Sequence, residues 1–256
     1  MKKEFLKEIK NNIKDLMKEN HFICEGQSYI RIVNKQILQI INFQGYSNGA
    51  RFTLNIGIIP LCSVEFPFLP VPHICIGQLY KEEYSGWEYN LESTKKASSM
   101  IKENILPLLE KHSNYDNIYQ ELKSLVDSVP REEKDWNDPK VVIYYSIDEE
   151  AMFWVCLKNK DYSKCKVLLK NMKLTNSKWL KANVKNCEEN IKNTEIPKYK
   201  NIFEENKNNF IEFANNKEKS IDGLEALLEK NKIDDLMIIA ENIEQKNLKT
   251  FEKYII

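Results

Sequence analysis

Three consecutive segments near the front of the chain alternate polar residues with β-branched or aromatic ones. They are separated by Asn34-Lys35 and by residues 45–49, which begin and end with glycine. Because successive side chains of a strand point to opposite faces, this alternation predicts strands, and the short turns between them predict an antiparallel meander. The predicted strands are Ser28–Val33, Gln36–Gln44 and Arg51–Ile59.

The apolar content of the strands indicates how they are covered. Segment 36–44 is largely apolar at both its odd and its even positions, so we expect a central strand with both faces buried. Segment 51–59 is expected to be half-buried, and residues 73–80 predict a further strand after a proline-rich loop.

Helices are predicted on either side of the meander. Phe5, Ile9, Ile13 and Met17 recur every four residues, which indicates an amphipathic helix that ends near residue 20. A second apolar stripe runs over residues 97–109 and contains Pro107, so a kink or break is expected near residue 104. A short helix over 115–126 follows.

The back half of the sequence is predicted to be helical. A polar, proline-flanked segment, 127–139, is the best candidate linker, and 141–145 is compatible with either strand or helix. We therefore expect an α+β fold, in which an N-terminal helix, an antiparallel sheet of about four strands and packed helices form a domain over 1–126. An all-helical half over 140–256 follows. Its predicted helices are 149–159, 162–172, 177–191, 199–213, 221–230 and 233–254.

Composition excludes few functions but favours an ordinary cytoplasmic protein. The 38 basic and 38 acidic residues give a net charge of zero, so no nucleic-acid partner is expected. The longest apolar runs are shorter than a membrane span, and no membrane association is expected. Six cysteines lack any Cys-x-x-Cys spacing, which favours reduced thiols that are mostly buried.

No catalytic, cofactor-binding or metal-binding motif is evident. There is no phosphate-binding glycine loop and no nucleophile elbow, and none of His21, His73 and His112 has another ligand type at helical spacing. No cofactor and no metal are expected. The candidate functional residues are instead polar or aromatic residues on and beside the sheet, which are the types that anchor interfaces. The predicted recognition surface consists of Arg31, Gln39, Gln44, Asn55 and Trp87. The alternative is a solvated sheet face with ordinary cross-strand pairs.

The front of the chain also resembles a known family. Residues Tyr29-Ile30-Arg31, 39–44 (Gln-Ile-Ile-Asn-Phe-Gln), 52–57 and Ile76-Gly77 with Trp87 resemble the bacterial family called domain of unknown function 4304. The resemblance spans about residues 3–111. It implies an α+β fold and a bacterial cytosolic protein, but no established reaction, cofactor or catalytic residue.

These observations lead to three functional hypotheses. The first is a non-enzymatic protein-binding module of immunity or inhibitor type, which would neutralise a toxin by covering its active site. The second is a small-ligand binder or enzyme with a cleft between the sheet and the helical tail. The third is a helical scaffold that acts through the tail alone. The oligomeric state is left open.

Overall fold

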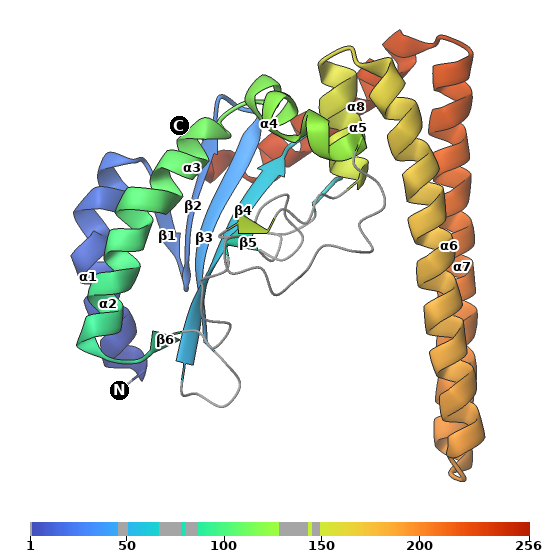
Figure 1. Cartoon of the computed structure of the whole chain (residues 1–256), viewed down its shortest axis with the longest axis horizontal. Coiled ribbons are helices and arrows are strands. Elements are labelled where there is room, and N and C mark those ends of the chain that lie inside the picture. Colours follow the sequence, from blue (N-terminus) through green and yellow to red (C-terminus); the bar gives the residue numbers. More distant parts are fainter. Residues whose placement is uncertain (1, 46–50, 67–77, 80–86, 128–142, 145–148) are drawn as a thin grey trace.

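The computed structural model describes residues 2–45, 51–66, 78–79, 87–127, 143–144 and 149–256 (Figure 1). Within these residues the chain has an α+β fold: an N-terminal helix and an antiparallel sheet come first, and a mostly helical half follows. The strand order of the main sheet is β1-β2-β3-β4-β6, so neighbouring strands are also consecutive among those in this sheet. Its strands are β1 (Ile23–Glu25), β2 (Ser28–Val33), β3 (Ile37–Gly45), β4 (Arg51–Pro60) and β6 (Trp87–Glu88).

The predicted meander is confirmed, and its register explains the alternation. Arg31 pairs with Gln39 across β2 and β3, and Asn42 pairs with Asn55 across β3 and β4. The turn between β2 and β3 places both Asn34 and Lys35 at positive φ (52° and 54°), which matches the hairpin geometry that suits the right-handed twist of the strands. A second, two-stranded sheet pairs β5 (Gln78–Leu79) with β7 (Ile143–Tyr144), so the described part of the ambiguous segment 141–145 is a strand.

Helices from the front half cover one face of the sheet (Figure 1). Side chains of β3 and β4 on this face, such as Ile41 and Ile56, share a core with Ile13 of the first helix and Ile101 of the next helical segment. The α-helical hydrogen bonding is interrupted before Pro107, near the expected position, because a π-helical stretch, Ile101–Ile105, precedes the proline. The front helices are α1 (Lys2–Glu19), α2 (Leu91–Met100), α3 (Leu106–Lys111) and α4 (Tyr115–Asp127).

The opposite face of the sheet is covered by the end of the chain. Phe251 and Tyr254 pack in a second core against residues such as Ile32 and Leu38, and Ile255 forms a parallel bridge with Ile32. This cover confirms that β3 is buried on both faces. It also makes the expectation of a half-buried β4 wrong, because Ile59 and its neighbours face this second core.

The back half contains fewer and longer helices than the sequence predicts. The predicted pair 162–172 and 177–191 is one helix, and so is the pair 199–213 and 221–230. Neither interruption contains glycine or proline, so nothing there ends a helix. The helices are α5 (Glu149–Lys158), α6 (Tyr162–Asn193), α7 (Pro197–Glu229) and α8 (Ile233–Thr250).

The two long helices form a hairpin that projects from the rest of the molecule (Figure 1). The hairpin comprises residues 162–229. At its base, α5 is buried over Ala151–Leu157 and contacts β4, α4, α6 and α8. The main core therefore includes residues of the sheet and of α5 to α8. The predicted linker 127–139 lies almost wholly outside the described residues, so the division into two domains stays a prediction.

Candidate interaction surface

Two residues of the predicted recognition surface lie inside the molecule. Arg31 and Gln39 are only 3% and 0% exposed, on the sheet face that the helices cover. The Arg31 Nε donates to Gln39 Oε1 (2.8 Å), and its terminal nitrogens donate to the Asn20 carbonyl (2.9 Å) and Glu110 Oε1 (2.5 Å). The guanidinium also lies 4.5 Å from the centre of the Phe22 ring. Arg31 thus ties the end of α1 to the sheet and α3, as a buried charge requires.

The other predicted residues do not join them. Asn55 is 4% exposed and donates to Gln44 Oε1 (2.5 Å) on the opposite face of the sheet, where Gln44 itself is exposed. The side chain of Trp87 lies outside the described residues. The expectation of one shared, exposed surface is corrected, because the five residues are divided between two faces and Arg31, Gln39 and Asn55 are buried.

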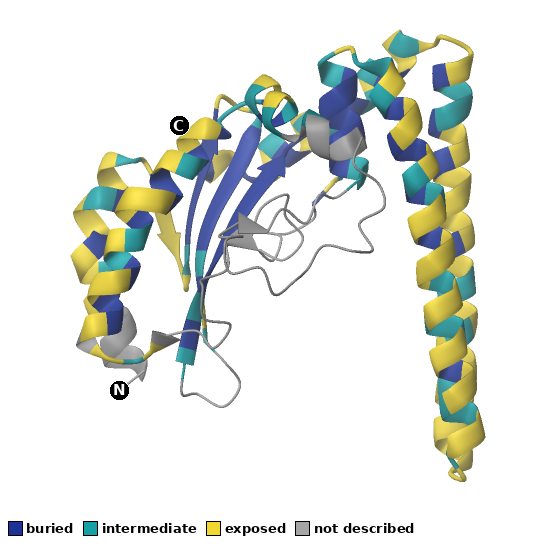
Figure 2. Cartoon of the chain, viewed as in Figure 1, coloured by how far each residue is buried: buried dark blue, intermediate teal, exposed yellow. Residues whose placement is uncertain are grey.

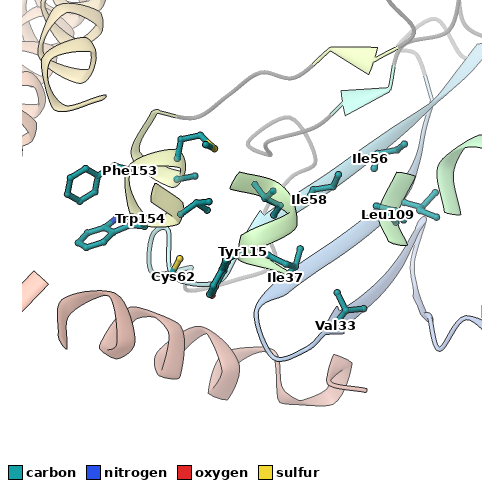
Figure 3. Close-up of a cluster of buried hydrophobic side chains, with 14 of the residues drawn as sticks. Val33, Ile37, Ile56, Ile58, Cys62, Leu109, Tyr115, Phe153 and Trp154 are labelled. Atoms are coloured by element: carbon teal, nitrogen blue, oxygen red, sulfur yellow. The ribbon is translucent and has the colours of Figure 1, made fainter. Parts of the chain in front are cut away.

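A partly buried polar cluster around Tyr115 joins the sheet to the back half. Tyr115 at the start of α4 donates its hydroxyl to Glu244 Oε1 (2.9 Å), and Lys158 Nζ lies 3.1 Å from the other carboxylate oxygen. Cys62 follows β4 and is fully buried beside the Tyr115 ring in Figure 3. Burial raises the pKa of the Cys62 thiol to about 12 and also raises the pKa of Tyr115.

The chemistry of this cluster favours a structural role. A thiol with a raised pKa carries little thiolate near neutral pH and is a poor nucleophile.

Within the described residues no group of three or more metal-ligating side chains is found. The described helices also include none with the length and hydropathy needed to cross a bilayer.

Exposed large hydrophobic side chains are concentrated elsewhere, on the hairpin. Of the ten such side chains in the described part of the chain, seven belong to α6, α7 or the turn between them. Figure 2 shows that most of the projecting length of the hairpin is exposed or intermediate. The seven residues are Val167, Leu174, Trp179, Ile196, Tyr199, Ile202 and Phe213.

The inward-facing residues of the hairpin lie in the contact between α6 and α7, which we call the seam. Asn176 of α6 is buried and donates to the Ala214 carbonyl of α7 (2.9 Å). Each of these residues lies where the sequence analysis expected a helix to be interrupted, so the hydrogen bond joins the two expected interruptions. Ion pairs cross the seam at Lys173–Glu225 (2.6 Å) and Lys207–Glu188 (2.7 Å). The outward-facing hydrophobics are therefore additional to those that hold the hairpin together.

Three aromatic rings form a cluster at one edge of the seam. Trp179 packs edge-on against Phe210, with ring centres 5.4 Å apart, and lies 5.3 Å from Phe213. Trp179 is 37% exposed and Phe213 is 56% exposed. Tryptophan and large apolar side chains that stay accessible are typical of protein interfaces. We call Trp179, Phe210 and Phe213 the aromatic patch.

The sequence contained a signal for the exposed apolar residues of α6. In a helix over 162–193, Val167 and Leu174 are seven residues apart and lie opposite the buried positions Met172 and Asn176. The prediction of two shorter helices, 162–172 and 177–191, hides that relation, because Leu174 then lies in the interruption between them.

Comparisons with family models, with curated proteins and with solved structures gave no match to this chain. The resemblance to domain of unknown function 4304 therefore stays a prediction, and the candidate surface rests on the structure alone.

Proposed function

We propose that this chain is a cytoplasmic protein-binding module, of the immunity or inhibitor type, that contacts its partner through the hairpin. The observation that carries the proposal is the concentration of exposed large hydrophobics on a pair of helices whose seam is already filled. A solvated structural hairpin has no need of an accessible tryptophan and phenylalanine side by side. A partner that covers them removes apolar surface from water, at about 25 cal/mol per Å² buried.

The position of the hairpin supports the same function. A rigid projecting element can enter or cover a concave site on another protein, which is what inhibition by occlusion requires. Little conformational entropy is then lost on binding, because the helices are formed beforehand. The buried side chains of Arg31 and Gln39 would instead act on stability.

The test is capture of partners by the tagged full-length protein from lysate of its own host, followed by reconstitution with the purified partner. The variant Trp179→Ala/Phe213→Ala removes the exposed rings, and Ile23→Ala/Ile238→Ala is the matched control, since these side chains are also exposed but lie off the hairpin. Phe213→Asp serves as a second variant, because more than half of that side chain is exposed and the Trp179–Phe210 contact remains.

The expected result is one stoichiometric protein whose binding is lost in both hairpin variants and kept in the control. Circular dichroism and thermal unfolding establish that each variant is folded. A partner bound equally by all four proteins, or a co-purifying small molecule with no protein partner, would contradict the proposal and favour the ligand-binding hypothesis.

A further inference from the structure

The outer face of α6 has an unusual distribution of charge. Between Tyr162 and Cys187 the sequence has seven lysines and no aspartate or glutamate, although the whole chain has equal numbers of basic and acidic residues. Lys173 faces the seam, where it pairs with Asp222 and Glu225 (both 2.6 Å). Several of the others face solvent.

Helical geometry aligns these lysines in one stripe. Positions 167, 174 and 181 are seven residues apart and so drift by only about 20° per step around the helix. Residues 170, 178 and 185 lie within about 40° of this line at 3.6 residues per turn. The stripe is about 27 Å long at 1.5 Å per residue. All six of its residues are exposed: Val167, Lys170, Leu174, Lys178, Lys181 and Lys185. We call them the lysine stripe.

The stripe lies opposite the seam. The buried residues of α6, among them Cys165, Met172 and Asn176, face α5 and α7. Among the described contacts, Glu189 of the same helix lies 3.8 Å from Lys185, and both side chains are more than half exposed. Exposed pairs of this kind are weak, so a partner carboxylate can replace Glu189 at little cost. Lys178 is also engaged in an interaction, although its side chain is exposed.

We propose that the lysine stripe docks an acidic surface of the protein partner, and the inference rests on the proposed function. The positive charge of the stripe favours an anionic partner. The exposed Val167 and Leu174 favour a protein over other anionic partners, because they need apolar side chains to pack against. These two side chains lie seven residues apart on the same line as the lysines, which matches the spacing at which a helix presents apolar contacts to another helix. The complementary surface would be a helix with carboxylates flanking two apolar residues.

Other anionic partners fit this face less well. Single-stranded nucleic acid is bound with aromatic rings between the cations, and the stripe has none, because Trp179 packs against Phe210 and Phe213 at the seam. A helix that lies in a membrane surface buries a broad apolar face, whereas only two of the six stripe residues are apolar.

The first experiment measures binding of fluorescent probes to the full-length protein. The main probe is a helical peptide with two leucines seven residues apart and glutamates on both sides; the comparison probes are the same peptide with glutamines, a short DNA duplex, and vesicles of phosphatidylcholine with phosphatidylserine. The variant is Lys170→Gln/Lys178→Gln/Lys181→Gln/Lys185→Gln. The control Lys198→Gln/Lys200→Gln/Lys219→Gln/Lys230→Gln removes the same charge from exposed lysines outside the stripe.

We expect the acidic peptide to bind best, with an affinity that falls as salt rises and falls about tenfold or more in the stripe variant. The control variant should stay within about twofold of wild type, since it changes net charge but not the stripe. Equal losses in both variants, tighter binding of DNA or vesicles, or no binding of the acidic peptide to the wild-type chain would each overturn the inference.

The second experiment separates this inference from the proposed function. The partner captured through the hairpin is tested against both sets of variants. If it no longer binds Trp179→Ala/Phe213→Ala but binds the stripe variant normally, the hairpin function stands and the acidic docking surface is wrong. If neither variant affects binding, both proposals fail.

Discussion

Replacing Arg31 with alanine tests whether this residue acts in the fold or in recognition. The side chain of Arg31 is 4% exposed and donates three hydrogen bonds, to Gln39, Asn20 and Glu110. In the alanine variant, the buried Gln39 Oε1 and the partly buried Asn20 carbonyl each lose the hydrogen bond that Arg31 donates to them. We therefore expect Arg31→Ala to lower the free energy of unfolding.

The size of the loss follows from these contacts. A buried acceptor that loses its partner costs about 1–3 kcal/mol, and a partly buried one costs less. The contact of the guanidinium with Phe22 contributes about 1 kcal/mol. The ion pair adds less than about 1 kcal/mol, because the Glu110 side chain is 59% exposed. The total is about 3–5 kcal/mol.

Urea unfolding followed by circular dichroism measures this difference. Glu110→Gln is the matched control and should change the free energy of unfolding by less than about 1 kcal/mol, because it removes only the solvent-exposed partner. An Arg31→Ala protein within about 1 kcal/mol of wild type would refute the reasoning. If that stable variant also failed to bind the partner protein, Arg31 would have a role in recognition.

Three further predictions follow from other buried groups. Asn247 is fully buried and bonds three backbone groups of segment 61–66 (2.7–2.9 Å), so Asn247→Ala should cost about 2–4 kcal/mol in urea unfolding. Burial lowers the pKa of His112 below 6.5, so the unfolded chain binds this proton more tightly; stability should fall as pH drops below 6.5, and less so in His112→Gln. In a Cys75→Ser chain, Ellman's reagent should label Cys24 quickly and the four other cysteines only after denaturation, and fast labelling of a second thiol would contradict their burial.

Local patterns were sufficient to predict β2, β3, β4 and the front helices, whereas the short strands β1 and β6 were not predicted. The alternation over 28–59 predicts β2, β3 and β4, because side-chain period and turn residues are properties of adjacent residues. Pro107 likewise predicts the helix irregularity that appears as the π-helical segment. Face assignment was also available from the sequence but was not applied: Gln39 and Gln44 differ by five positions in one strand, so they had to lie on opposite faces, and the prediction of one surface that contains both was wrong.

Contacts between distant segments were not predictable in the same way. The cover that buries Ile59 comes from Phe251 and Tyr254, almost two hundred residues later, and no local pattern connects them. Arg31 is a residue type that often anchors interfaces, yet it is buried here, because the end of α1 and α3 cover it with the Asn20 carbonyl and Glu110. The two long helices of the hairpin were not predicted, because the apolar patterns are interrupted at Asn176 and at Ala214. The hydrogen bond between these two residues forms only when α6 and α7 pack together, so no local pattern shows it.

The position of the hairpin in the chain explains how the sheet contributes to binding. The hairpin is inserted between α5, which contacts β4, and α8, whose Glu244 and Asn247 bond to Tyr115 and to the segment after β4. Both ends of the hairpin are thus anchored on the sheet side of the molecule. An anchor at one end would let the hairpin swing, whereas two anchors hold it in place before the partner arrives and reduce the entropy lost on binding. The polar cluster around Tyr115 and the buried Asn247 therefore affect recognition indirectly, because they fix the base of the hairpin that makes contact.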